Sequence, residues 1–550
     1  MSFNFRVKLV TPPCVIVEAG ENKLRLLSLE DELRFPPPAS AFIAGYLKQR
    51  HVEVEQDDLD ILVCHDIELS NRLEERLRAL PFPVRVCEHL SNENFNRLAD
   101  LLFQRIDWSG FDLIAFSVPE NQVLSFAITI GLADRVKKET NTPVVLGGRG
   151  VWFVDPAQVL KDFDSVDYLI IGKGENALYE LCRTLVTDSP TEDRIPGLVY
   201  RSNGGIHVNK CITHWGSTNL IPDFKGLDVK AYEYPLNLVI RSLSKRSEIR
   251  CPFDKTTSGV TIFPYQFVDG CVNQCAFCTS SLSKCKMTPV EQTVETLAKI
   301  NAETEARHFF FLNTEINASY KYVDRFCDEI IRSNLDIMWT DSACLENFDE
   351  KLLTKMRKAG CIRLWYGVEL ASDRMLKFVE KRLTVEQAEK GLKMAHEVGI
   401  WNGVNLIAGM PYETQRDVEL TLEFIERNRD FIDAFEINRF RLEPTSRFVR
   451  FPGKFGIRLM PTGMDFEEIN GLSWRERKQQ TERSLAQLQG VINPRYNIVA
   501  QNPYIIFHLY SLFKDKEPVK EWVKFISTKL DKSAVESLSK LKYRNLDWRL

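Results

Sequence analysis

Three cysteines, Cys271, Cys275 and Cys278, stand within ten residues in the run Gly270-Cys-Val-Asn-Gln-Cys-Ala-Phe-Cys-Thr279. Thiolates are the usual ligands of iron–sulfur clusters, and a cubane cluster takes four ligands. A loop that offers three leaves one iron open, and an open position at a metal is typical of catalysis. A structural zinc site is the alternative, but its nearest further ligand, Cys285, follows a gap of six residues with no histidine nearby. The spacing therefore favours a catalytic iron–sulfur cluster.

The composition is that of an ordinary globular protein. The chain has 550 residues, 44% of them hydrophobic, so we expect about two to four domains. Lys plus Arg (72) nearly balances Asp plus Glu (76), which gives no basic excess for binding nucleic acid. The N-terminus has no signal-peptide pattern, and no apolar stretch approaches the length of a membrane span. With 13 cysteines, these features predict a cytoplasmic enzyme with reduced thiols.

Residues 1–190 alternate short apolar runs with amphipathic segments. Candidate strands are 5–11, 52–55, 113–117, 144–147 and 168–171, and candidate helices are 39–49, 94–104, 123–139 and 176–185. Alternation of strands and helices, with strands that are apolar throughout, predicts an α/β fold with a doubly wound parallel sheet.

The carboxyl ends of these strands are rich in small residues. Ligands of doubly wound sheets bind beyond those ends, and glycine lets the backbone approach a ligand closely. Any single loop of this kind could be plain turn chemistry, but four on one edge favour a ligand. The candidate binding residues are Thr11, Ser117, Gly147, Gly148, Gly172, Gly174 and Glu175.

Residues 191–255 lose this periodicity and are predicted to form a linker, with a small hairpin at 197–208. A second alternating stretch, 256–450, has candidate strands at 260–267, 308–312, 337–342, 362–368, 403–408 and 434–441. Six β/α units in a row predict a partial barrel. Residues 451–550 are predicted to be mainly helical.

Chemistry in β/α barrels sits at the carboxyl ends of the strands, and polar residues follow successive strands here. The cysteine loop follows the first strand, Glu315 the second, and Glu369 ends the fourth. The fifth runs into the sequence Ile407-Ala-Gly-Met-Pro-Tyr-Glu-Thr414, and the sixth carries Arg439 and Arg441. The two arginines could clamp an anion or form surface ion pairs.

Together these residues resemble the radical S-adenosylmethionine (SAM) superfamily over about 255–445. In that family three cysteines hold a [4Fe–4S] cluster whose open iron chelates SAM, and electron transfer gives a 5′-deoxyadenosyl radical. The resemblance implies that Glu315 meets the SAM amine, although Asn313-Thr314 stand where the family often has Gly-Gly. It also places Glu369 near the ribose or methionyl end, and Phe277, Ile407 and Gly409 at the adenine.

The first domain resembles the cobalamin-binding domain that precedes the barrel in one branch of this superfamily. The matching residues are Pro36-Pro-Pro38, Phe42-Ile-Ala-Gly-Tyr-Leu47, Gly147-Gly148 and Gly172-x-Gly-Glu175. The signature Asp-x-His-x-x-Gly, which supplies a histidine to cobalt, is absent, so no such histidine is expected to bind the metal. A domain that kept the fold but lost the corrin is the alternative.

The two resemblances imply a cobalamin-dependent radical SAM enzyme, most simply a methyltransferase acting on an unactivated carbon or phosphorus. The expected partners are a small-molecule or peptide substrate and an electron donor of the flavodoxin or ferredoxin type, without nucleic acid or membrane. A cobalamin-associated rearrangement or cyclisation enzyme is an alternative. A tRNA methylthiotransferase is another alternative. It would need a basic RNA-binding tail and three more cluster cysteines in the first domain, where Cys14, Cys64 and Cys87 exist.

Overall fold

The computed structural model describes residues 5–18, 23–26, 33–79, 93–119, 123–187, 191–210, 220–243, 258–346, 348–461 and 465–530. Residues 211–219 and 244–255 of the expected linker, and residues 462–464 and 531–550 of the expected helical segment, lie outside these ranges. The chain forms two compact units that meet in sequence between Tyr232 and Glu233. None of the described helices combines the length and the apolar character needed to cross a membrane.

The first unit is built on a seven-stranded sheet with the strand order β4-β1-β5-β6-β7-β8-β9. The strands are β4 (Glu53–Asp58), β1 (Arg6–Thr11), β5 (Leu113–Ser117), β6 (Val144–Gly147), β7 (Tyr168–Ile170), β8 (Leu198–Ser202) and β9 (Gly205–Val208). The first five of this order are parallel, and in chain order they run 2-1-3-4-5. This is the flavodoxin-like order, and it confirms the predicted doubly wound sheet.

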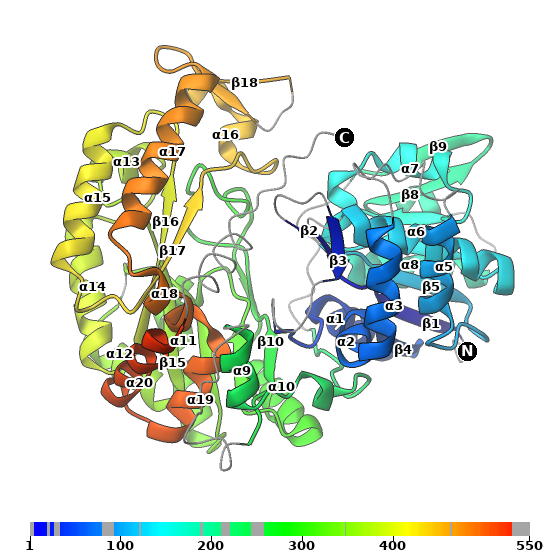
Figure 1. Ribbon diagram of the computed structural model, residues 1–550, viewed down its shortest axis with the longest axis horizontal. Helices are drawn as coiled ribbons and strands as arrows, with labels where there is room; N and C mark the ends of the chain where they lie inside the picture. The colour runs from blue at the N-terminus through cyan, green and yellow to red at the C-terminus, as the bar shows by residue number, and fades with distance from the viewer. Residues whose placement is uncertain are drawn as a thin grey trace. The chain divides into compact units, whose positions relative to one another are not determined.

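Helices cover both faces of this sheet because its strands are apolar on both sides (Figure 1). Leu113 and Ala115 join a core with α1 and α8, whereas Ile114 and Phe116 join a core with α3, α5 and α6. Side chains alternate between faces along a strand, so one apolar run serves both cores. The helices are α1 (Pro38–Lys48), α2 (Leu59–His65), α3 (Ile67–Arg78), α5 (Glu93–Phe103), α6 (Val123–Thr140), α7 (Pro156–Asp162) and α8 (Gly174–Thr187).

The sheet extends beyond residue 190, where the sequence predicted a linker. The hairpin β8–β9 is formed as expected, with Asn203 and Gly204 in the left-handed turn positions, and β8 pairs antiparallel with β7. Leu198 and Val199 enter the cores of opposite faces, which holds the hairpin in the sheet. A further small hairpin joins β2 (Val15–Glu18) and β3 (Lys23–Leu26).

The second unit contains six parallel strands in the order β10-β13-β14-β15-β16-β17, the partial barrel that the sequence predicted. They are β10 (Ile262–Tyr265), β13 (His308–Phe311), β14 (Met338–Ala343), β15 (Cys361–Glu369), β16 (Trp401–Ala408) and β17 (Ala434–Arg439). The helices between them are α10 (Val290–Thr304), α11 (Tyr320–Arg332), α12 (Glu350–Lys358), α13 (Asp373–Phe378), α14 (Val385–Glu397) and α15 (Gln415–Arg427), with α9 (Leu236–Ser242) before the first strand.

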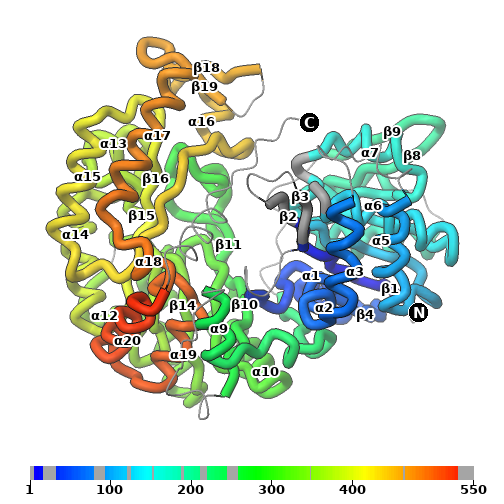
Figure 2. Tube along the Cα trace, viewed as in Figure 1, coloured from blue at the N-terminus to red at the C-terminus, as the bar shows by residue number. Residues whose placement is uncertain are grey.

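The C-terminal segment is mainly helical and packs at both ends of the barrel strands (Figure 2). Its elements are α16 (Arg447–Arg450), β18 (Ile457–Leu459), β19 (Phe466–Glu468), α17 (Trp474–Gly490), α18 (Pro494–Gln501), α19 (Pro503–Phe513) and α20 (Lys516–Lys529). Helix α17 lies along α15, β16 and β17. Helices α18 to α20 instead reach the amino ends of the strands, where Trp401 Nε1 donates to Ala500 O (3.1 Å).

Candidate active site

The three cysteines lie on one loop, residues 270–285, that follows β10. Two short antiparallel strands, β11 (Val268–Asp269) and β12 (Lys286–Met287), close the loop at its base. Gly270 begins it with φ +77°, and a side chain there would overlap the backbone of Lys284. The sharp entry into the cysteine loop therefore requires a glycine.

Backbone contacts hold the cysteine loop on the barrel from two sides. Ala276 N donates to Val379 O (2.8 Å) at the end of α13, and Phe448 N donates to Ala276 O (3.0 Å). Arg447 Nη1 donates to Gln274 O (2.8 Å). The segment around α16 and the end of α13 thus hold the loop on the barrel.

Glu315, which the resemblance places at the SAM amine, lies directly against the first cysteine. Its Oε2 accepts from Cys271 Sγ (3.0 Å) and from Asn273 Nδ2 (3.0 Å). The carboxylate is buried, with 5% of its surface exposed. An ammonium group of a ligand at this position would gain a charge-assisted hydrogen bond.

The Asn-Thr pair that replaces the family's Gly-Gly has a structural function. Asn313 Oδ1 accepts from the backbone N–H groups of Phe267 (2.9 Å) and Val268 (2.7 Å), where the chain enters the cysteine loop. Its Nδ2 donates to Asp341 Oδ2 (2.7 Å) on β14. Burial raises the pKa of Asp341 well above its usual range. Asn313 therefore ties the loop to the neighbouring strand, which a glycine could not do.

Glu369 ends β15 in the left-handed region, with φ +65°, and forms a buried ion pair that the sequence analysis missed. Lys381 Nζ lies 3.0 Å from Glu369 Oε1, and both side chains are nearly inaccessible. Burial alone lowers the pKa of Lys381, but Glu369, Cys275 and Cys344 together raise it above its usual value. Lys381 stands in a run of charged residues that resembles a solvated turn, so no local pattern indicated a role for it.

Two of the three residues expected at the adenine pack against one apolar cluster. Phe277 and Ile407 both pack against a core that includes Met410 and Phe440. Gly409 follows β16 with φ +91°, where a side chain would overlap Thr481 of α17. Phe277 and Ile407 are therefore partly buried apolar side chains of one cluster, and an aromatic base packs favourably on such side chains.

Burial raises the pKa of all three loop thiols. The Glu315 carboxylate raises the pKa of Cys271 further. The Lys381 ammonium opposes the rise at Cys275, whose pKa is about 12. Among the described residues no three Cys, His, Asp or Glu side chains converge on one ion position. Each cysteine of a [4Fe–4S] site binds a different iron, so a cluster site does not require the three thiols to converge on one point.

In the first unit, a cavity of 390 Å³ opens at the carboxyl edge of the sheet, around the ends of β1, β5, β6 and β7. Its walls are mostly apolar, and all seven residues singled out from the sequence line it: Thr11, Ser117, Gly147, Gly148, Gly172, Gly174 and Glu175. Gly148 has φ +89°, and a side chain there would overlap Val118. No histidine is found among the described residues that line the cavity.

Arg439 forms an ion pair with Glu482 of α17. This is the surface ion pair that the sequence analysis weighed against an anion clamp, and Arg439 is therefore not free to bind a ligand. Arg441 also has an interaction partner.

Comparison with known proteins identifies the second unit. Residues 265–425 match the family model of the radical SAM superfamily. An uncharacterized methyltransferase of Pyrococcus horikoshii is 28% identical over 52% of this chain and 58% of its own length. Anaerobic magnesium-protoporphyrin IX monomethyl ester cyclase of Rubrivivax gelatinosus is 26% identical over 52% of this chain and 50% of its own. The chain thus spans about half of the length of these relatives.

A solved structure shares the fold of the whole chain. The radical SAM methyltransferase TsrM of Kitasatospora setae, described with cobalamin and a [4Fe–4S] cluster bound, matches with a TM-score of 0.59 at 15% identity. The match covers 98% of this chain and 99% of TsrM. Residues 265–425 therefore carry a radical SAM domain, and the fold of the chain is that of TsrM.

Proposed function

We propose that this protein is a cobalamin-dependent radical SAM methyltransferase that acts on an unactivated carbon or phosphorus of a small molecule or peptide. One observation carries the proposal. The same chain joins a cysteine loop on a parallel barrel to a flavodoxin-like sheet whose edge cavity is lined by all seven expected residues. The P. horikoshii relative, named a methyltransferase, supports the reaction class.

In the barrel, Cys271, Cys275 and Cys278 would hold the [4Fe–4S] cluster, which when bound supplies the electron that cleaves SAM to a 5′-deoxyadenosyl radical. Glu315 would accept hydrogen bonds from the SAM ammonium, as it accepts from Asn273 Nδ2 at 3.0 Å. The Lys381–Glu369 pair would offer a cation to the carboxylate of SAM and an anion to its ribose. Phe277 and Ile407 would cover the adenine and exclude water.

In the first unit, the edge cavity fits a corrinoid in its chemistry. Its walls are mainly apolar, and Gly148 and Gly172, with φ +89° and +100°, line it without side chains. Cobalamin, when bound, carries a methyl group between SAM and a carbon that cannot attack SAM itself. With no histidine among the described lining residues, we infer that the protein supplies no imidazole to the cobalt.

A second reaction class has support of its own. The R. gelatinosus relative is named a cyclase, which favours ring formation as the alternative outcome of the same radical. Either reaction requires a one-electron donor, and we propose a flavodoxin or ferredoxin.

The test is anaerobic reconstitution of the full chain with iron, sulfide and hydroxocobalamin. Broad iron–sulfur absorption, retained corrin and 5′-deoxyadenosine after addition of SAM and reductant are the expected results. S-adenosylhomocysteine in the presence of substrate would identify methyl transfer, whereas its absence during turnover would favour cyclisation. Failure to retain corrin would overturn the cobalamin part, and failure to form 5′-deoxyadenosine would overturn the radical part.

A further inference from the structure

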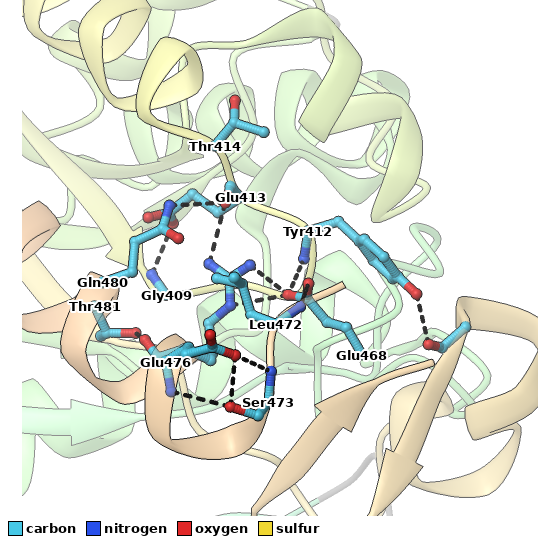
Figure 3. A network of polar contacts seen from close by, with 12 residues as sticks. Gly409, Tyr412, Glu413, Thr414, Glu468, Leu472, Ser473, Glu476, Gln480 and Thr481 are labelled. Carbon is cyan, nitrogen blue, oxygen red and sulfur yellow. Dashed lines mark hydrogen bonds and ion pairs between the residues drawn. The ribbon is translucent and has the colours of Figure 1, made fainter. Parts of the chain in front are cut away.

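Helix α17 of the C-terminal segment presents an unusual buried surface. A helix on a globular protein normally buries an apolar stripe. The first turns of α17 instead bury Arg477, Thr481 and Ser484, which are spaced three or four residues apart and so share one face. Arg477 and Ser484 donate to Glu413 of the loop 409–414, which follows β16, and Thr481 lies against Gly409 of the same loop. Figure 3 shows Gln480 and Thr481 beside this loop.

The contacts of this face converge on Glu413. Ser484 Oγ donates to Glu413 Oε1 (2.7 Å), and Glu413 Oε2 in turn accepts from Gly409 N (2.7 Å). Arg477 Nη1 (3.1 Å) and Gln480 Nε2 (3.0 Å) both donate to Glu413 O. The side chain of Glu413 is 2% exposed, so these bonds form in a site without competing water.

A second set of bonds fixes the rest of the loop. Arg477 also forms a buried ion pair with Glu468, whose Oε1 accepts from Tyr412 N (2.7 Å). Tyr412 has φ +59°, a left-handed conformation that is held by this bond. Thr481 packs where a side chain on Gly409 would lie. The path of the loop backbone therefore depends on α17.

We propose that α17 positions the SAM-binding loop, and that Arg477, Gln480 and Ser484 are positioning residues that act on SAM through Glu413 and Gly409. The inference rests on the proposed function, which assigns Ile407 to the adenine, and on the resemblance, which places Gly409 there. None of the three α17 residues touches the cysteine loop in the contacts described. Loss of these bonds should therefore weaken SAM binding while leaving the cluster intact.

The test compares Ser484→Ala and Gln480→Ala with wild type as the full chain reconstituted with iron and sulfide. We expect the Kd and KM for SAM to rise about tenfold in Ser484→Ala, since a hydrogen bond to a buried carboxylate is lost. The rate of 5′-deoxyadenosine formation at saturating SAM and the visible spectrum should change little. Ser484→Thr, which keeps the hydroxyl, should restore the affinity.

Lys516→Met is the matched control. Lys516 pairs with buried Asp433 (2.7 Å) and donates to Ile400 O (2.8 Å), so it also joins the C-terminal segment to the barrel, but at the amino ends of the strands. It should lower Tm without changing the Kd for SAM. An unchanged Kd in Ser484→Ala, or an equal rise in Lys516→Met, would overturn the inference. Wild type that binds SAM without cleaving it would overturn the proposed function, and the Kd comparison would still decide the role of α17.

Discussion

Lys381 Nζ lies 3.0 Å from Glu369 Oε1 at the carboxyl end of β15, and both side chains are almost fully buried. A buried ion pair is expensive to assemble, and removing one partner leaves an uncompensated charge. The charge of Lys381 also acts on Cys275. The pair therefore links the cysteine loop to the strand end where SAM is proposed to bind.

Replacement of Lys381 by Met should weaken SAM binding by at least about tenfold, or about 1.4 kcal/mol, because Glu369 loses its partner. Equilibrium dialysis with SAM measures the effect. Lys355→Met is the control, since Lys355 pairs with Asp324 (2.5 Å) and Asp328 (3.0 Å) on the outer helix layer. Equal affinities for SAM in the two variants would contradict a role for Lys381 at the site.

Replacement of Cys271, Cys275 and Cys278 together by Ala should abolish the iron content and the broad visible absorption of the reconstituted protein. Cys285→Ala should keep both, since Cys285 is not among the three predicted ligands. Iron quantitation and the spectrum are the measurements. Iron retained by the triple variant, or lost in Cys285→Ala, would show that the ligand set is different.

Gly148→Ala should prevent loading of hydroxocobalamin, because φ is +89° and a Cβ would overlap Val118 at the rim of the cavity. Gly204→Ala provides a control with similar backbone strain, since φ is +74° but no atom lies within 4 Å of the added Cβ. Corrin absorbance after gel filtration measures loading. Normal loading in Gly148→Ala would place the corrinoid elsewhere.

The second unit should lose stability in acid through two histidines. Burial lowers the pKa of His308 to about 4, with a contribution from His508, and burial lowers the pKa of His508 to about 4 as well. Unfolded histidine titrates near 6.5, so the unfolded chain binds more protons below that pH. The contribution of the two histidines to the free energy of unfolding is therefore fully present above about pH 6.5. It falls towards pH 4, by up to about 3 kcal/mol for each histidine.

Denaturant unfolding between pH 7.5 and 4.5 measures this loss. His508→Gln should reduce the slope, because an amide can still donate to Tyr234 O, the partner of His508 Nε2 at 2.9 Å, without taking up a proton. His207→Gln, at an exposed position of the β8–β9 hairpin, should leave the slope unchanged. The prediction fails if the slopes of the wild type and His508→Gln coincide.

Much of the fold was predictable because strand and helix periods are local properties of the sequence. The strands at 113–117 and 144–147 were predicted with the bounds that the structure has, since continuous apolar runs between turn residues have few other interpretations. The hairpin β8–β9 was also predicted, but its place in the sheet was not. That place depends on Leu198 and Val199 reaching cores built by residues far away in the chain.

The sequence by itself determined which residues could do chemistry: three thiols at a fixed spacing, and small or acidic residues at the ends of successive strands. A short spacing along the chain limits how far apart the side chains can be, so this information is local. Only the tertiary structure decided which side chains meet them. Lys381 reaches Glu369, Asn313 ties the cysteine loop to Asp341, and Ser484 reaches Glu413 across 71 residues of sequence. Such pairs arise from packing between distant segments, and no local pattern specifies them.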